Sequence, residues 1–231
     1  MKIVSWNVNS VKARLPNLLA YLQEAKPDVV CLQELKCVDE AFPRMEVEAL
    51  GYNVETHGQK TYNGVALLSK SPLEDVTRGL PNFEDEQSRY IEAVVSTDKG
   101  AVRVASLYLP NGNPTEGGSG PKYSYKLAWM AALEAHARSL MAHEEAVVLA
   151  GDYNVIPTAA DVHDPAAWEG DALEDINRTQ RALEQFNREA GFLLPTHCHE
   201  MEGQISPEGR YRIWKELWFL KYLGLSLASK S

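Results

Sequence analysis

Short apolar segments with the length of β-strands follow one another in the middle of the chain without helices between them. They read "NGVALLSK", "YIEAVVS" and "AVRVASLYLP". Strands joined in this way pair antiparallel, whereas a regular alternation of strands and helices builds a parallel sheet. Helices are predicted elsewhere, over 11–22 behind the N-cap residue Ser10 and over 124–143. The pattern therefore predicts a layered α/β domain with substantial antiparallel pairing, and not a purely parallel doubly wound sheet.

Polar residues stand at the ends of four predicted strands, which read "IVSWN", "VVCLQE", "VASLYLPNG" and "VVLAGDYN". They are Asn7, Glu34, Tyr108, Asn111, Asp152 and Asn154. Ligands and catalytic groups gather where strands of α/β sheets end, because the sheet fixes their positions and the loops leave room. A set with few carboxylates and several amide oxygens suits Mg²⁺. Zinc sites usually contain His or Cys, and neither residue is placed with these groups.

Each of these residues also has an ordinary structural interpretation. Glu34 could be a solvated strand end, and Asn7 and Asp152 could belong to turns. Tyr108 could be a core residue whose hydroxyl group is satisfied. Their combination favours a site, because chance would have to put all of them at strand ends in one chain.

Composition limits the class of protein. The chain has 231 residues, 45% of them hydrophobic, which is enough for one large domain with a substantial core. A net charge of -9 argues against a protein that grips nucleic acid with its whole surface, but not against a nuclease with a local basic strip. The three Cys suggest no disulfide framework, and Cys31 is expected in the core. No segment approaches the roughly 20 apolar residues of a membrane span. We expect a cytoplasmic monomer that does not contact a membrane.

Several segments together closely resemble the exonuclease III branch of the endonuclease/exonuclease/phosphatase superfamily. They are "WNVNSVKARL", "PDVVCLQELKC", "GVALLSK", "RYIEA", "SLYLPNGNP", "YKLAWM" and "LAGDYNVIP". The resemblance covers residues 1–173, the expected catalytic body. It implies a four-layer α/β sandwich in which two packed mixed sheets are flanked by helices. It also implies Mg²⁺- or Mn²⁺-dependent phosphodiester cleavage in double-stranded DNA, at abasic sites and from 3′ ends, in base excision repair.

The same resemblance implies roles for individual residues. Glu34 is the principal metal ligand, assisted by Asn7. Asp152 orients or deprotonates the attacking water, and Asn154 helps to hold the phosphate; both also belong to the expected metal-binding set. Tyr108 stabilises the charge that develops on the phosphate.

Four further residues near these motifs are candidates for contact with DNA. They are Arg89, Asn111, Lys122 and Lys126. The charged residues among them could equally be solvated surface charges, and for the two lysines that interpretation is slightly favoured.

Residues 174–231 depart from the family pattern. The family closes with an Asp-bearing strand motif and a terminal Ser-Asp-His segment, and neither has a match here, since no Asp follows Asp175. We interpret these residues as an atypical tail, out of frame or foreign to the catalytic body, with the C-terminal strands missing or replaced. The cluster His197-Cys198-His199 is expected to be a loop and not a metal site.

Three functions are therefore weighed. The first is an active metal-dependent DNA phosphodiesterase, and the second is a catalytically impaired remnant that binds metal or DNA without turnover. The third is a phosphatase or phosphodiesterase of the same superfamily with a non-DNA substrate, although "LQELKC" and "YLPNGNP" favour DNA. Losing one preorganised group costs roughly 10²–10³ in rate, so the absent closing motifs predict reduced activity.

Overall fold

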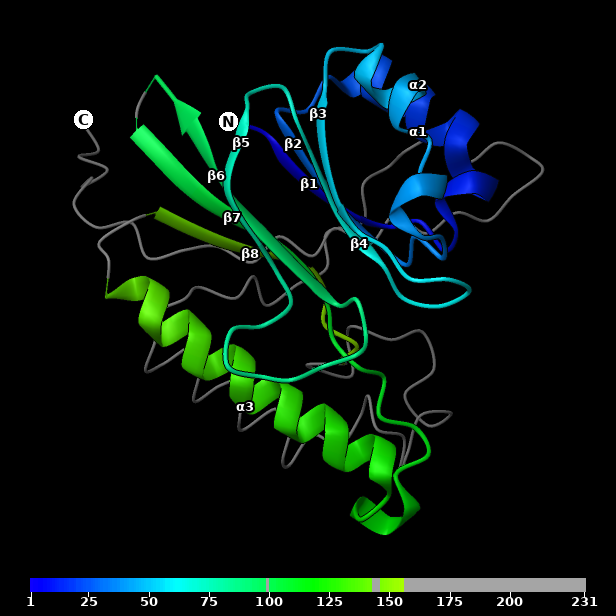
Figure 1. Ribbon diagram of the computed structural model, residues 1–231, viewed down its shortest axis with the longest axis vertical. Coiled ribbons are helices and arrows are strands. Elements are labelled where there is room, and N and C mark those ends of the chain that lie inside the picture. The colour runs from blue at the N-terminus through cyan, green and yellow to red at the C-terminus, as the bar shows by residue number, and fades with distance from the viewer. Residues whose placement is uncertain (99, 143–145, 156–231) are drawn as a thin grey trace, which may run out of the picture.

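The computed structural model describes residues 1–98, 100–142 and 146–155. Two four-stranded sheets pack face to face in this part of the chain, and helices cover both outer faces (Figure 1). The layers run from α1 (Val11–Ala25) and α2 (Arg44–Glu48), through the two sheets, to α3 (Pro121–Met141). The predicted four-layer α/β sandwich is thus confirmed.

The first sheet has the strand order β1-β2-β4-β3. Its strands are β1 (Ile3–Asn7), β2 (Val29–Gln33), β4 (Val65–Ser69) and β3 (Asn53–His57). β1 and β2 are parallel and joined by α1, whereas the other pairs are antiparallel. Because side chains alternate along a strand, Val30 and Leu32 pack toward α1 while Val29 and Cys31 pack toward the second sheet.

The second sheet has the strand order β5-β6-β7-β8. Its strands are β5 (Leu73–Arg78), β6 (Tyr90–Thr97), β7 (Gly100–Tyr108) and β8 (Ala146–Asp152). The parallel pair β7 and β8 is joined through α3, and the remaining pairs are antiparallel. Short 3-10 turns are η1 (Asp39–Ala41) and η2 (Glu116–Gly118).

Most of the predicted elements are present. Ser10 caps α1, where its Oγ accepts a hydrogen bond from the Ala13 N–H at 3.4 Å. Trp129 and Leu133 of α3 are buried against the outer face of the second sheet, and Cys31 is fully buried. β3 and β5 were not predicted. These edge strands bury only part of their residues, and their many polar side chains leave no continuous apolar segment in the sequence.

Gly151 lets β8 run close beside β7. A Cβ atom at this position would lie 2.0 Å from the carbonyl oxygen of Leu107, so any other residue would collide with the neighbouring backbone. Close pairing therefore continues to the ends of both strands, where Asp152 lies opposite Tyr108.

Several predictions concern residues outside the described part of the chain. They include the proposed atypical tail 174–231 and the His197-Cys198-His199 cluster. Among the helices of the described residues, none is long and apolar enough to cross a membrane.

Candidate active site

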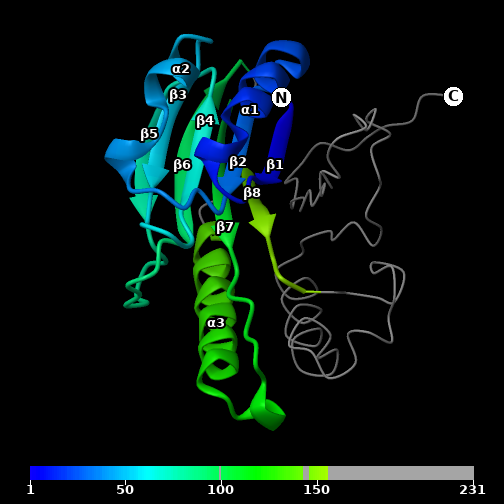
Figure 2. The same cartoon turned by 90° about the vertical axis from the view of Figure 1, so that its right-hand side faces the viewer.

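The site lies where two pairs of parallel strands end. β1 and β8 face each other across the two sheets, at the same side of the sandwich (Figure 2). Asn7 is the last residue of β1 and Glu34 follows β2 directly; Tyr108 and Asp152 end β7 and β8. The carboxyl ends of all four strands thus deliver a polar residue to one place.

Hydrogen bonds join these four side chains into a single cluster. The amide nitrogen of Asn7 donates to Glu34 Oε1 at 2.9 Å and to Asp152 Oδ2 at 2.8 Å. The hydroxyl group of Tyr108 donates to the same Glu34 oxygen at 2.9 Å. All four residues are partly exposed, so the cluster is open to a substrate.

Asn154 is tied to both neighbouring strand ends. Its backbone N–H donates to Asp152 Oδ1 at 3.0 Å, and its side-chain nitrogen donates to the Leu109 carbonyl at 2.7 Å. Its φ of 47° lies in the left-handed region, which asparagine tolerates better than most residues. The Asp152 carboxylate is therefore oriented by two hydrogen bonds, one from the backbone N–H of Asn154 in the turn after β8 and one from the side chain of Asn7.

Asn7 presents nitrogen, and not oxygen, to the two carboxylates. Its Oδ1 accepts a hydrogen bond from the backbone N–H of Asn9 at 3.0 Å, which fixes the orientation of the amide group. An amide N–H cannot bind a cation. In this arrangement Asn7 holds Glu34 and Asp152 together, and its expected role as a metal ligand stays a prediction.

Lys36 and Asn9 also belong to the cluster, and neither was predicted from the sequence. The Lys36 ammonium lies 2.9 Å from Glu34 Oε2, and it also donates to Asn9 Oδ1. A signal was available, since Lys36 stands two residues after Glu34 in "LQELKC". What the pattern did not contain is the left-handed backbone at Glu34 and Lys36, with φ of 56° and 55°, which shapes this segment.

A buried polar network ties the sheets together beneath the site. Gln33 is 1% exposed, and its side-chain nitrogen donates to Ser106 Oγ at 3.0 Å. Ser106 Oγ in turn donates to the Leu32 carbonyl at 2.9 Å, while Ser5 Oγ donates to Gln33 Oε1 at 3.3 Å. Because satisfied buried networks are directional, they fix the position of β7 relative to β1 and β2 behind Glu34 and Tyr108.

The environment separates the protonation behaviour of the acidic groups. Burial acts to raise the pKa of Glu34, but the hydrogen bonds from Asn7, Lys36 and Tyr108 outweigh it, so that pKa lies below its usual range. Burial raises the pKa of Asp152, and the hydrogen bonds from Asn7 and the Asn154 N–H offset only part of this effect. Burial, with the charge of Glu34, also raises the pKa of the Tyr108 phenol. The site thus pairs an ionised carboxylate with a more basic one and a neutral phenol.

The predicted DNA-contacting residues differ in placement. The guanidinium of Arg89 lies over the Tyr108 ring, with its Cζ 4.8 Å from the ring centre, and Nη1 donates to the Tyr108 carbonyl at 3.1 Å. Asn111 and Lys122 are exposed. Lys126 is 0% exposed, and its amine donates to backbone carbonyls, which corrects the prediction that it contacts DNA.

The donor set fits a hard divalent cation. Glu34 and Asp152 contact the same amide nitrogen, so their carboxylates are close enough to share one ion. Glu34 also forms an ion pair with the Lys36 ammonium group. Within the described residues no group of three His, Cys, Asp or Glu gathers, so the remaining ligands would be amide oxygen, water and phosphate. That combination is typical of Mg²⁺.

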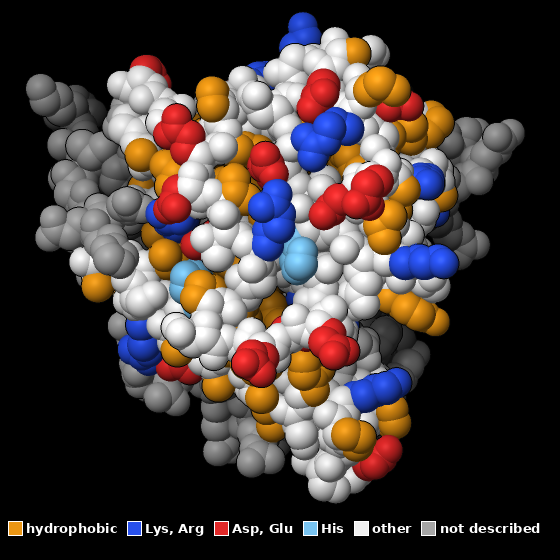
Figure 3. Space-filling model, viewed as in Figure 1, with side chains coloured by type: hydrophobic (Ala, Val, Ile, Leu, Met, Phe, Trp, Pro, Cys, Tyr) orange, Lys and Arg blue, Asp and Glu red, His pale blue; other side chains and the backbone are white. Residues whose placement is uncertain are grey.

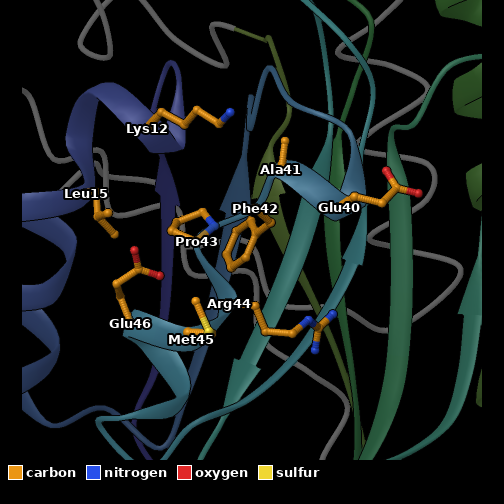
Figure 4. Close-up of a pocket in the computed structure, with 9 residues that line it drawn as sticks. All are labelled: Lys12, Leu15, Glu40, Ala41, Phe42, Pro43, Arg44, Met45 and Glu46. Atoms are coloured by element: carbon orange, nitrogen blue, oxygen red, sulfur yellow. The ribbon is translucent and has the colours of Figure 1, made fainter.

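A separate hollow of about 480 Å³ lies among α1, η1 and α2 (Figure 4). None of the predicted site residues lines it. Its walls carry two basic residues, Lys12 and Arg44, and two acidic ones, Glu40 and Glu46, so it has no evident preference for an anion. Acidic and basic side chains are likewise interspersed over the face that Figure 3 shows.

Comparisons with known proteins place these features in a family. Residues 4–220 match the model of the Endonuclease/Exonuclease/phosphatase family, a range that extends beyond residue 173. The chain is 37% identical to exodeoxyribonuclease III of Haemophilus influenzae over 163 residues, which cover 70% of this chain and 60% of that protein. It therefore spans less than two thirds of that relative.

The solved structures that are similar to this one include the following two. The first is the 3′ phosphatase NExo from Neisseria bound to a product DNA hairpin, with a TM-score of 0.75 and 37% identity over 84% of this chain and 72% of that chain. The second is an AP endonuclease from Archaeoglobus fulgidus, with a TM-score of 0.79 and 29% identity over 94% of this chain and 85% of that chain.

Proposed function

This chain belongs to the endonuclease/exonuclease/phosphatase family as an exonuclease III-type member, and on that basis we propose that it hydrolyses phosphodiester bonds in DNA with the help of a divalent cation. The observation that carries the proposal is the convergence of Glu34 and Asp152 on one amide nitrogen, beside the phenol of Tyr108. Two neighbouring carboxylates at an open strand end cost stability and are explained by a cation and a substrate.

Glu34 and Asp152 would hold Mg²⁺ or Mn²⁺, with the side-chain oxygen of Asn154 as a further donor. When bound, the ion supplies Lewis-acid polarisation of a phosphoryl oxygen and compensates its negative charge. Asn7 keeps the two carboxylates at a fixed separation, and Lys36 holds the second oxygen of Glu34.

Asp152 is the residue suited to orient and deprotonate the attacking water. Burial raises the pKa of its carboxyl group, and a more basic carboxylate takes a proton more readily at neutral pH. Asn7 and the Asn154 N–H each occupy one of its oxygens, so the group has a defined direction. Such preorientation is what an in-line attack on phosphorus requires.

Tyr108 acts as a neutral hydrogen-bond donor. Its raised pKa keeps the phenol protonated, and its O–H can turn from Glu34 to a phosphate oxygen as charge develops there. Arg89 covers the ring and restricts its movement.

The substrate class in this proposal is double-stranded DNA with abasic sites or 3′ ends. Arg89, Asn111 and Lys122 would contact its phosphate backbone from the partly exposed surroundings of the site. We further propose that the protein acts as a monomer in the cytoplasm and does not contact a membrane.

A second candidate activity is the removal of a 3′ phosphate from DNA. It is favoured by the similarity to the Neisseria protein, whose structure is that of a 3′ phosphatase with a product hairpin. The same carboxylates and phenol would serve it, because both reactions transfer a phosphoryl group to water.

The test uses the full chain, Mg²⁺ and three labelled duplexes, with one abasic site, a plain recessed 3′ end, or a 3′ phosphate. We expect hydrolysis of at least one duplex that disappears in Glu34→Ala and in chelator. Hydrolysis of the 3′-phosphate duplex alone would select the phosphatase. Binding without any turnover would contradict the enzymatic proposal and select the impaired remnant, whereas turnover of non-DNA phosphates alone would move the substrate outside DNA.

A further inference from the structure

Lys126 is a fully buried lysine next to the site, and neither the site residues nor the proposed chemistry accounts for it. It lies on α3 with 0% of its surface exposed. Burying an ammonium group is expensive unless acceptors surround it, so lysine is almost never fully buried without a compensating arrangement. Its position therefore requires an explanation in terms of what it binds.

Two of its acceptors are backbone carbonyls of the two segments that build the site. The amine donates to the carbonyl of Asn154 at 2.7 Å and to that of Asn111 at 3.2 Å. Asn154 follows Asp152 at the end of β8, and Asn111 follows Tyr108 at the end of β7. One charged group thus spans the two strand ends that carry the proposed base and the phenol.

The two segments are joined at further points, but close to the strands. The Leu109 N–H donates to the Asp152 carbonyl at 2.9 Å, and the Asn154 side chain donates to the Leu109 carbonyl at 2.7 Å. Lys126 adds a link further out, at Asn111. It also holds the carbonyl of Asn154, a residue whose left-handed φ of 47° needs support from its surroundings.

We propose that Lys126 is a positioning residue, whose ammonium group fixes the segments after β7 and β8 relative to each other so that Asn111 and Tyr108 meet the same phosphate as Asp152 and Asn154. This inference rests on the proposed function for its catalytic consequence. Its structural part, a clamp between two backbone segments, stands independently of any reaction. A displacement of about 1 Å at a reacting group can cost roughly 10²-fold in rate. If the Lys126 clamp prevents a displacement of this size at Asp152 or Tyr108, its loss should therefore lower the rate.

The experiment compares three variants of the full chain. Lys126→Met keeps a long apolar stem and removes the donors, and Lys126→Arg keeps charge and donors. Lys70→Met is the matched control, because Lys70 also donates to a backbone carbonyl, that of Lys26, but at the start of β2, the opposite end of the first sheet from the site.

The first readout is backbone amide exchange, which needs no enzymatic activity. For Lys126→Met we expect exchange to quicken by about tenfold or more in residues 109–113 and 152–155 together, with the middle of α3 unchanged. Lys126→Arg should restore part of the protection, and Lys70→Met should leave both segments as in the wild type. Unchanged exchange in the two segments, or a rise spread evenly along α3, would overturn the clamp.

The second readout is steady-state hydrolysis of whichever DNA substrate the wild type cleaves. Lys126→Met should lower kcat by about 10²-fold with little change in KM, and Lys126→Arg should recover part of kcat. An unchanged kcat, or a loss confined to KM, would overturn the positioning role. If Lys126→Met does not fold, Lys126→Gln takes its place in both readouts, with smaller effects in the same direction. A wild type without turnover would refute the proposed function, while the exchange readout still decides the clamp.

Discussion

Within the part of the chain that the structure describes, two glutamates accept a hydrogen bond from a tyrosine, and their surroundings differ sharply. Tyr90 donates to Glu92 at 2.7 Å on the outer face of the second sheet, and Tyr108 donates to Glu34 at 2.9 Å at the strand ends. Glu92 is only 2% exposed, and His136 Nε2 lies 2.9 Å from its carboxylate. Glu34 is more exposed and has a second carboxylate, Asp152, as its neighbour through Asn7.

The difference separates a group that stabilises the fold from one that is available for chemistry. Arg103 lies 3.3 Å from Glu92, so this buried charge is surrounded by donors and a cation within the fold itself. At the strand ends a cation from Lys36 reaches Glu34, while the pKa of Asp152 is raised by burial and, in smaller part, by the Glu34 charge. Like charges left together at an open edge indicate a functional site, and a closed network of opposite charges indicates a structural one.

The largest expected effect comes from neutralising Glu34. Glu34→Gln keeps the side-chain shape but removes the charge that would bind a cation, so hydrolysis of DNA should fall by about 10²–10³-fold or more. The free energy of unfolding should fall only slightly, because the contacts with Lys36, Asn7 and Tyr108 that lower the pKa of Glu34 are weakened at a partly exposed site, while a like charge beside Asp152 disappears. Steady-state kinetics and urea unfolding measure the two quantities; a large loss of stability would contradict the assignment of Glu34 as functional.

The same substitution at Glu92 should give the opposite result. Glu92→Gln removes the charge that Arg103 and Tyr90 contact, while Arg103 keeps its ion pair with Asp75, so the free energy of unfolding should fall by about 2 kcal/mol. The rate per folded molecule should stay close to that of the wild type, because Glu92 does not contact the site cluster. Urea unfolding and kinetics at a temperature where the variant is folded provide the check. A Glu92→Gln variant that is as stable as the wild type but inactive would contradict the structural role assigned to Glu92.

A smaller effect is expected from removing the phenol groups. Tyr108→Phe should lower the rate by about tenfold, since one neutral donor contributes roughly 1–1.5 kcal/mol. Tyr90→Phe should leave the rate unchanged and lower the free energy of unfolding by about 1 kcal/mol, because a buried hydrogen bond to Glu92 is lost. Equal effects of both substitutions on the rate would contradict the separation of the two regions.

The smallest effect is a dependence of stability on acid. Burial acts to raise the pKa of Glu92, but the hydrogen bonds from His136 and Tyr90 outweigh it, so the folded-state pKa lies below its usual range. Its stabilisation is therefore fully present above the unfolded pKa of about 4.3 and is lost as the pH falls through the lower folded value. The difference in unfolding free energy between the wild type and Glu92→Gln should begin to narrow as the pH falls below about 4.3. A difference that stays constant down to pH 3 would rule out this linkage.

Much of this arrangement was predictable from the sequence, and the exceptions have physical causes. Asn7, Glu34, Tyr108 and Asp152 were found because apolar strands that end in polar residues leave a visible pattern, and parallel strands bring such ends together. The burial of Lys126 was not predictable, because the two acceptors that hold its amine at the site are backbone carbonyls, which every residue possesses.

Orientation was the other property that the sequence did not contain. The hydrogen bond from the Asn9 N–H to Asn7 Oδ1 turns the nitrogen of Asn7 toward the two carboxylates, and no sequence pattern indicates which way an amide group faces. The pairing of Gln33 with Ser106 across the two sheets depends on how the sheets stack, which strand patterns alone do not specify. The edge strands β3 and β5 were not predicted, because their exposed residues obscure the alternation of apolar and polar side chains that is typical of a strand.

The central claim, that Glu34 and Asp152 form one cation site, is tested most directly by titrating Mn²⁺ calorimetrically into the wild type, Glu34→Gln, Asp152→Asn and Glu92→Gln. We predict one site in the wild type, with the affinity lowered by about tenfold or more in the first two variants and unchanged in Glu92→Gln. Wild-type affinity in both Glu34→Gln and Asp152→Asn would contradict the account.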